Sequence, residues 1–467
     1  MELWSIWISL VNQFRLACNR NRTFFWLVTI LIGFTIKFDS IGVTSIARGV
    51  GLMPGYYTCL LNFFNSTAVN IFSLRTLWIN LVFNQFVGLT RINGRYLLVG
   101  DGIKIGKEGK KMPGVKYLHQ ESESNSKAEY IMGHSIQVVC ILAKGLSTYF
   151  SIPLVGMIHE GIRFTYKDSR TLLDKMFEML ADLELPVPIY FVADKYYASG
   201  PFMKKLIYSG VHIITMMKRN AVAYYAPEPE NKRSGRPKKY GKRVKLFDLF
   251  KTDLNFIVAP MPGNPSLMIE YCVVELFWKP LGDLAKFVLV RHPEKGNSIP
   301  MSTDRSLDPM DIIQGYSLRF KIEVMFKQAV HQIGAFMYHF WLKAMLPRKR
   351  GNGEIVLQFE SDDFREKIIK KLNAYHLFIQ LGFIAHGLMQ YLSLHHHQIV
   401  WKYFGTWLRT IRSNTLPSEK VVALALSRTY IEFLIDNTIG CIFKKFLRKR
   451  TDSSQLQHSN FELNQAA

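Results

Sequence analysis

Two short apolar segments that each end in an aspartate constrain the fold of this 467-residue chain more than any other feature. They read RYLLVGD (95–101) and PIYFVAD (188–194). Short apolar runs bounded by turn signals are typical of strands buried on both faces, which occur in sheets covered by helices. The pair therefore predicts an α/β fold, with Asp101 and Asp194 at the sheet edge where α/β proteins place their ligands.

The segments around these two strands follow an α/β order. Apolar runs at 134–142 and 147–158 predict two more strands after the first, and 211–217 predicts one after the second. Residues 169–183 predict a helix, because their apolar positions recur three and four residues apart. A second, β-rich region is predicted from three further runs: 255–260, 267–278 and 286–291.

The charge of the chain indicates a class of partner. Lys and Arg number 59 against 36 Asp and Glu, a formal net charge of +23. Such an excess predicts attraction to a polyanion, either nucleic acid or an acidic membrane surface. The 48% hydrophobic content allows a sizeable core and excludes wholesale disorder. Five cysteines without CxxC spacing suggest neither a zinc site nor a disulfide framework, which fits a reducing cytoplasm.

One N-terminal segment raises the question of a membrane. Phe24 to Phe34 is apolar, but it is about half of the roughly 20 residues that spanning requires. Lys37 and Asp39 follow at once. We expect a buried helix and no membrane partner. A basic membrane-associated protein anchored here is the alternative.

The same N-terminal region contains a pattern of helix, glycine-containing turn and helix between Val43 and Phe64. A helix-turn-helix that contacts DNA has this form, and so does an αα-hairpin that only packs. Both interpretations stay open.

Asp101 and Asp194 suggest a chemistry if their strands are neighbours. Two adjacent carboxylates repel each other unless a cation neutralises them, and Mg²⁺ or Mn²⁺ prefers such oxygen ligands. The alternative for each aspartate alone is a turn or helix-cap residue.

A third segment begins as a well-formed helix. Asp308 is a predicted N-cap and Pro309 takes the first helical position. If the helix continues, a polar stripe about 80° wide forms beside an apolar face of Ile313, Phe320 and Val324. The stripe contains Tyr316, Arg319, Glu323 and Lys327. Glu323 on that edge is a candidate third metal ligand, and the alternative is a surface stripe of ordinary ion pairs.

Three ordered blocks, at 96–134, 190–202 and 302–328, together resemble bacterial insertion-sequence transposases of the DDE type. The resemblance covers roughly residues 90–330. More narrowly, the chain is similar to the subgroup with a Tyr-x2-Arg-x3-Glu-x6-Lys helix and a β-rich insertion. Tyr316, Arg319 and Glu323 match this motif, whereas the motif lysine is Val330 here. Lys327, on the same stripe, is a candidate substitute, and a decayed copy that only binds DNA is the alternative.

The resemblance implies an RNase H-like mixed sheet with Asp101, Asp194 and Glu323 as catalytic metal ligands. Two Mg²⁺ ions, or Mn²⁺, would activate water to cut a phosphodiester, and the freed 3′-OH would attack target DNA. The implied partners are double-stranded DNA, at terminal inverted repeats and at the target, and a second copy in a synaptic homodimer. The implied location is the cytoplasm, on the nucleoid. Tyr316 and Arg319 would position the DNA backbone near the cut.

Further DNA contacts are predicted outside the acids. The basic loop at 231–245 contains Arg236, Lys238 and Lys239, in a Gly-Arg-Pro context that suits an A·T minor groove. A solvated loop that binds DNA without specificity is the alternative. Trp278 is the candidate for receiving a flipped base, as some relatives do, and a core strand tryptophan is the alternative.

These observations divide the chain into six expected segments. They are 1–90, helical and a candidate DNA-end-binding region; 91–217, the first part of the RNase H-like core; 218–300, the basic loop and β-rich insertion; 301–345, the catalytic helix; 346–450, a helical region after a polar linker; and 451–467, a polar tail.

Overall fold

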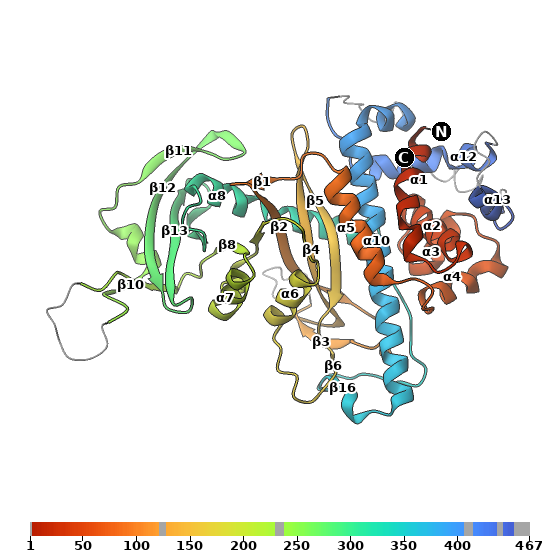
Figure 1. The fold of residues 1–467 in the computed structure, drawn as a ribbon, viewed down its shortest axis with the longest axis horizontal. Coiled ribbons are helices and arrows are strands. Elements are labelled where there is room, and N and C mark those ends of the chain that lie inside the picture. The colour runs from red at the N-terminus through yellow and green to blue at the C-terminus, as the bar shows by residue number, and fades with distance from the viewer. Residues whose placement is uncertain (1, 121–127, 229–237, 406–413, 437–441, 453–467) are drawn as a thin grey trace. The chain divides into compact units, whose positions relative to one another are not determined.

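The computed structural model describes residues 2–120, 128–228, 238–405, 414–436 and 442–452, and contains a large mixed sheet flanked by helices (Figure 1). The predicted mixed α/β class is therefore confirmed. The chain forms two compact units, one of residues 1–89, 102–169 and 323–467, and the other of 90–101 and 170–322. We call them the terminal unit and the central unit. They differ from the six segments expected from the sequence.

The central unit is built on parallel strands. β2 (Arg95–Gly106) enters it with its first half, and it pairs in parallel with β7 (Ile189–Val192), which pairs in parallel with β8 (His212–Met216). These strands agree with the apolar runs of the sequence. Helices α6 (Leu172–Ala181), α7 (Gly200–Tyr208) and α8 (Pro309–Leu318) complete this part of the unit.

The β-rich region of the central unit continues the same sheet. β15 (Pro300–Ser302) pairs with β8 on one side and with β13 (Asp283–His292) on the other, and β13 pairs with β12 (Asn264–Trp278). The three runs predicted as strands are confirmed as β11 (Ile257–Met261), β12 and β13. The remaining elements are β1 (Arg91–Ile92), η3 (Lys195–Tyr197), β9 (Val222–Tyr224), β10 (Arg243–Lys245), η4 (Leu246–Lys251) and β14 (Gly296–Ser298).

The terminal unit contains an antiparallel group of strands. β4 (Tyr130–Lys144) pairs with β3 (Lys116–His119) and with β5 (Tyr149–Ile158). The second half of β2 lies beside β4, where the Lys107 amide donates to the Met132 carbonyl at 2.8 Å. Along the chain, the long strands β2, β4 and β5 precede α6 and β7, which is the order of strands, helix and strand that the apolar runs predict.

A long helix covers β5 in the terminal unit. α10 (Asp362–Phe404) runs beside it, together with α5 (Ile71–Gln85), as Figure 1 shows. Gly156 of β5 allows this close approach, because an added Cβ would lie 2.8 Å from the Phe383 ring of α10. Within the described residues, α10 is the helix long and apolar enough to cross a membrane, and 94% of its apolar window is buried inside the protein.

The terminal helices pack on α10 or on one another. They are α1 (Glu2–Asn12), η1 (Gln13–Ala17), α2 (Asn21–Ile36), α3 (Gly42–Gly49), η2 (Pro54–Tyr56), α4 (Tyr57–Phe64), α11 (Glu419–Arg428), α12 (Tyr430–Ile435) and α13 (Ile442–Arg448). α2 contains the apolar segment Phe24 to Phe34, whose side chains are mostly buried, so the expected buried helix is confirmed. α3 and α4 confirm the predicted helix, turn and helix, and both interpretations of that hairpin remain predictions.

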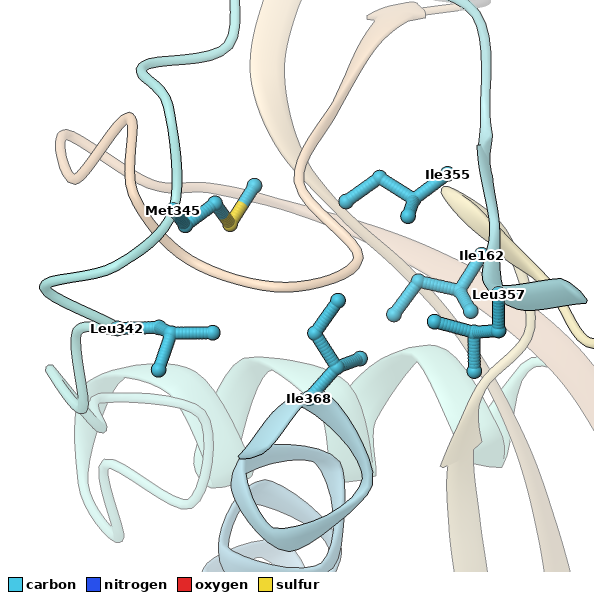
Figure 2. Close-up of a cluster of buried hydrophobic side chains, with 6 residues drawn as sticks. All are labelled: Ile162, Leu342, Met345, Ile355, Leu357 and Ile368. Atoms are coloured by element: carbon cyan, nitrogen blue, oxygen red, sulfur yellow. The ribbon is translucent and has the colours of Figure 1, made fainter. Parts of the chain in front are cut away.

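A small apolar cluster anchors the predicted polar linker. Ile162 of β6 (Ile162–Arg163) lies in it beside Ile355 of β16 (Ile355–Val356), which pairs with β6 in parallel (Figure 2). Its other members are Leu342, Met345, Leu357 of η5 (Leu357–Phe359) and Ile368 of α10. Met345 and Ile355 flank the linker at 346–354, so both ends of this polar segment are held in one buried cluster.

Candidate active site

The register of β2 and β7 places the two aspartates at equivalent positions. Val99 of β2 is the partner of Val192 of β7, and each aspartate follows its valine by two residues. Side chains two residues apart in a strand lie on the same face, and neighbouring strands are about 4.8 Å apart. Asp101 and Asp194 therefore project from one face of the sheet at adjacent positions, as the sequence predicts.

The opposite face explains the glycine that precedes Asp101. Phe191 of β7 fills the space above Gly100, where an added Cβ would lie 2.3 Å from the phenyl ring. The Phe191 ring also lies 6.1 Å from that of Phe202 in α7. Sequence analysis did not identify Gly100 as a site residue, although a glycine inside a strand signals a close approach.

Asp194 is held by the turn after β7. Its Oδ1 accepts a hydrogen bond from the Tyr196 amide at 2.9 Å, so Asp194 is the N-cap of η3. Thr215 of β8 donates through its hydroxyl to the Asp194 carbonyl at 2.7 Å. The capping hydrogen bond uses Oδ1 of Asp194, so Oδ2 takes no part in the cap. The cap role is therefore compatible with a role as a metal ligand.

Helix α8 lies on the face from which the aspartates project. Its start is the predicted one, since Asp308 accepts a bond from the Met310 amide at 2.8 Å and Pro309 follows. Gly315 brings the helix close to the sheet, because an added Cβ would lie 3.0 Å from Ile214 of β8. This approach places Tyr316, in the last turn of α8, and Arg319, which follows the helix, over the two aspartates.

Arg319 forms an ion pair with the first aspartate. Its Nη1 lies 3.0 Å from Oδ2 of Asp101, and the two side chains are 17% and 21% exposed. Burial raises the pKa of Tyr316, while Arg319 lowers it and Asp194 raises it again. Tyr316 thus lies in the field of Arg319 and of both aspartates. The polar stripe predicted for this helix exists as far as Arg319.

The helix does not continue through Glu323 without a break, which corrects the prediction of one long helix. α8 ends at Leu318, and α9 (Lys321–His331) begins after a turn. The amides of Arg319 and Ile322 bond to carbonyls three residues earlier, and such bonds tighten the chain. Neither proline nor glycine marks this turn in the sequence.

The break changes which side chains are buried. Phe320 and Val324 are 49% and 43% exposed, so the predicted apolar face is wrong beyond Ile313. The buried positions of α9 are Ile322, Met325, Phe326 and Ala329.

Glu323 and Lys327 are both exposed on α9, and Glu323 belongs to the terminal unit. Among the residues that the structure describes, no three His, Cys, Asp or Glu side chains gather as a group that could hold a metal ion. The structure therefore brings together Asp101, Asp194, Tyr316 and Arg319, and it does not describe the three acids as one cluster.

The other predicted DNA contacts lie elsewhere in the chain. Arg236 is outside the described residues, whereas Lys238 and Lys239 are exposed. Trp278 at the end of β12 is 6% exposed, as a core tryptophan is. It also lines a pocket of about 440 Å³ whose wall contains Lys218 and Lys279.

The fold and this pair of aspartates define an α/β protein with two neighbouring carboxylates on one face of its sheet. The chain belongs to the DDE superfamily endonuclease family, whose model matches residues 13–252. Members of this family generally use divalent metals. The matched range contains Asp101 and Asp194 and ends before α8, so it does not reach Arg319 or Glu323.

Other comparisons add little. No curated protein matches the chain significantly. One similar solved structure is a piggyBac transposase synaptic complex with hairpin DNA, at 12% identity over 94% of this chain and 81% of that chain. Its TM-score of 0.37 does not establish a shared fold.

Proposed function

We propose that this protein is a DDE transposase that cuts DNA at the ends of an insertion sequence and joins the freed ends to target DNA. The observation that carries the proposal is the adjacent position of Asp101, inside β2, and Asp194, just after β7, with Arg319 at the C-terminal end of α8 in an ion pair with Asp101. Membership of an endonuclease family supports phosphodiester cleavage as the reaction.

The chemistry of the donors fits a divalent metal. Mg²⁺ prefers carboxylate oxygens, and Asp101 and Asp194 project on one face at adjacent positions, each two residues after the last parallel pair of β2 and β7. The Asp101 carboxylate is already stabilised by a cation, the Arg319 guanidinium. We assign Asp101, Asp194 and Glu323 as the residues that hold two Mg²⁺ ions, or Mn²⁺ in their place. When bound, these ions supply the Lewis acidity that water attack and departure of the 3′ oxygen require.

The surrounding side chains position the DNA. Arg319 presents a planar guanidinium, which binds phosphate oxygens in a bidentate manner. Tyr316 keeps its proton at neutral pH, because its pKa is raised by burial, and it donates that proton in a hydrogen bond to the backbone of the DNA. Lys327, exposed on α9, adds a second cation in place of the motif lysine.

Contacts away from the acids extend the proposed DNA path. Arg236, Lys238 and Lys239 would bind the duplex through a loop, with a salt-sensitive contribution to affinity. Trp278 shares its pocket with Lys218 and Lys279, an arrangement of an aromatic ring and cations that suits a nucleotide. We further assign terminal inverted repeats and target duplex as partners, a homodimer as the working assembly, and the nucleoid of the cytoplasm as the location.

A nicking assay tests the proposal. The substrate is a supercoiled plasmid that carries the DNA flanking the reading frame, with Mg²⁺ present. The wild-type protein is expected to nick this plasmid, and Asp194→Asn is expected to bind the flanking DNA without nicking it. Asp253→Asn, an exposed aspartate of the same unit, is the matched control and should nick normally. Nicking by Asp194→Asn at the wild-type rate would refute the assignment.

A DNA-binding protein without catalysis is the second candidate. Val330 favours it, because the motif lysine is missing seven residues after Glu323. Binding of the flanking DNA by the wild-type protein, with no metal-dependent nicking, would establish this candidate instead.

A further inference from the structure

Two basic segments of the terminal unit lie side by side. One is 104–111, from the end of β2, and the other is 341–350, before the polar linker. The Leu342 amide donates to the Lys111 carbonyl at 2.9 Å, and the Arg348 amide donates to the Lys110 carbonyl at 2.8 Å. These two backbone bonds hold the second segment against the Lys110–Lys111 end of the first.

These segments concentrate positive charge. Together they contain eight Lys or Arg residues and one acid, Glu108, a net charge of +7 in a chain whose total is +23. Lys107 turns inward, with its ammonium 3.9 Å from the centre of the Tyr338 ring. Four lysines lie around the two backbone bonds, three of them exposed and Lys111 half-buried, and we call them the basic ridge: Lys110, Lys111, Lys343 and Lys349.

The basic ridge rests on a buried support. Leu342 and Met345 of the second segment belong to the apolar cluster that Figure 2 shows, together with Ile368 of α10. This anchoring holds the backbone beneath the lysines in one arrangement. A preorganised cationic surface loses less entropy when it binds a polyanion.

Large apolar side chains stand exposed beside the lysines. Trp341 is 63% exposed and Leu346 is 83% exposed. The Trp341 indole sits against Gly109, where an added Cβ would lie 2.7 Å from Nε1. Exposed apolar side chains among cations are the means by which some DNA-binding proteins wedge between base steps and bend the duplex.

We propose that the basic ridge, with Trp341 beside it, binds the backbone of target duplex DNA. Lysines bind phosphates as point charges, and contacts to phosphates carry no sequence information. Contacts of this kind suit target DNA rather than a specific terminal repeat. The choice of target DNA rests on the transposase function proposed above.

Binding to random-sequence DNA tests the ridge without any need for catalysis. The full chain, without metal, is titrated against a fluorescent 30-base-pair random duplex at several salt concentrations. A triple variant, Lys110→Ala, Lys343→Ala and Lys349→Ala, should bind about 10-fold or more weakly, and its salt slope should fall by about 2 to 3. Trp341→Ala should reduce bending of the duplex, measured by energy transfer between its ends.

A matched control removes the same charge from the same unit. Lys370→Ala, Lys402→Ala and Lys420→Ala replace three other exposed lysines, and this variant should bind within about 3-fold of the wild-type protein. Equal loss in both triple variants would overturn the ridge as a site, since net charge alone would explain the result. Stronger competition by single-stranded RNA than by duplex DNA would overturn the assignment of the partner.

A joining assay separates target DNA from element ends. In the ridge variant, cleavage of the element end should persist while joining to a target plasmid falls. Loss of cleavage together with joining would contradict the assignment to target DNA. If the wild-type protein cleaves nothing, the proposed function fails, while the binding titration still decides whether the ridge binds duplex DNA.

Discussion

Asp101 and Arg319 show how single residues prepare the site. Both side chains are mostly buried, and the Arg319 guanidinium lies 3.0 Å from the Asp101 carboxylate. The two residues are 218 positions apart in the chain. A partly buried charge keeps its ionised form most easily beside a partner charge. The pair therefore places a carboxylate and a guanidinium side by side, where a metal ion and a phosphate could bind.

Removing the guanidinium tests this role. Arg319→Ala should slow single-turnover nicking by about 10²- to 10³-fold, as the loss of one preorganised electrostatic contact does. Arg319→Lys should be intermediate, because lysine lacks the planar fork. Arg305→Ala is the matched control, since Arg305 forms an exposed pair with Glu275 in the same unit. Wild-type nicking by Arg319→Ala would rule out the positioning role.

Gly100 gives a prediction about stability. A methyl group at this position would overlap the Phe191 ring, with the nearest ring atom 2.3 Å from the added Cβ. Gly100→Ala should lower the free energy of unfolding by about 1–3 kcal/mol, as overpacking of a core does. Gly106→Ala lies in the same strand with nothing within 4 Å of the added Cβ, so it should unfold at the wild-type urea concentration. Equal urea midpoints for Gly100→Ala and Gly106→Ala would contradict this prediction, because the Phe191 ring would then have moved without any loss of stability.

At the scale of elements, the strands were predictable and their connections were not. The apolar runs that end in Asp101 and Asp194 predicted β2 and β7, because an apolar pattern directly reflects burial. Strand β15 carries no such signal, since Pro300–Ser302 is three residues long. Its pairing with β8 and β13 joins the β-rich region to the core sheet, and only tertiary structure creates that join.

The third acid shows a different limit of sequence analysis. Helical spacing predicted Glu323 on one stripe with Arg319, but the chain tightens between α8 and α9. The buried face then passes to Ile322 and its neighbours on α9. No residue with a strong turn preference stands there, so periodicity alone could not find the break.

Lys107, the residue after β2, is a buried amine that makes the stability of the fold depend on pH. Lys107 donates to the Phe336 carbonyl and lies on the Tyr338 ring, and burial lowers the pKa of Lys107 to about 7. The unfolded chain keeps the ordinary lysine pKa, so it binds more protons than the folded chain between pH 7 and about 10. The loss of stability caused by burying the Lys107 charge is therefore largest below pH 7 and decreases as the pH rises.

Lys107→Met isolates this effect. Relative to the wild-type protein, the variant should gain stability at pH 7 and lose that advantage by up to about 1.4 kcal/mol per pH unit towards pH 9. Urea unfolding of both proteins at pH 6.5, 7.5, 8.5 and 9.5 measures the difference. A difference that stays constant over this range would mean that Lys107 is not buried as a neutral amine.

At the scale of the whole molecule, the proposed metal site takes its acids from three segments that are far apart in the sequence. Asp101 lies in β2, Asp194 follows β7, and Glu323 lies in α9. The sheet edge and α8 position the first two acids with Arg319. The proposal requires all three acids to act on the same ions.

Binding of Mn²⁺, followed by electron paramagnetic resonance, tests that requirement most directly. The wild-type protein should bind two ions. Asp101→Asn, Asp194→Asn and Glu323→Gln should each lose at least one of them, and the exposed control Glu294→Gln should lose none. Two ions bound with equal affinity by wild-type protein and Glu323→Gln would contradict the account, because the third carboxylate would then hold no metal.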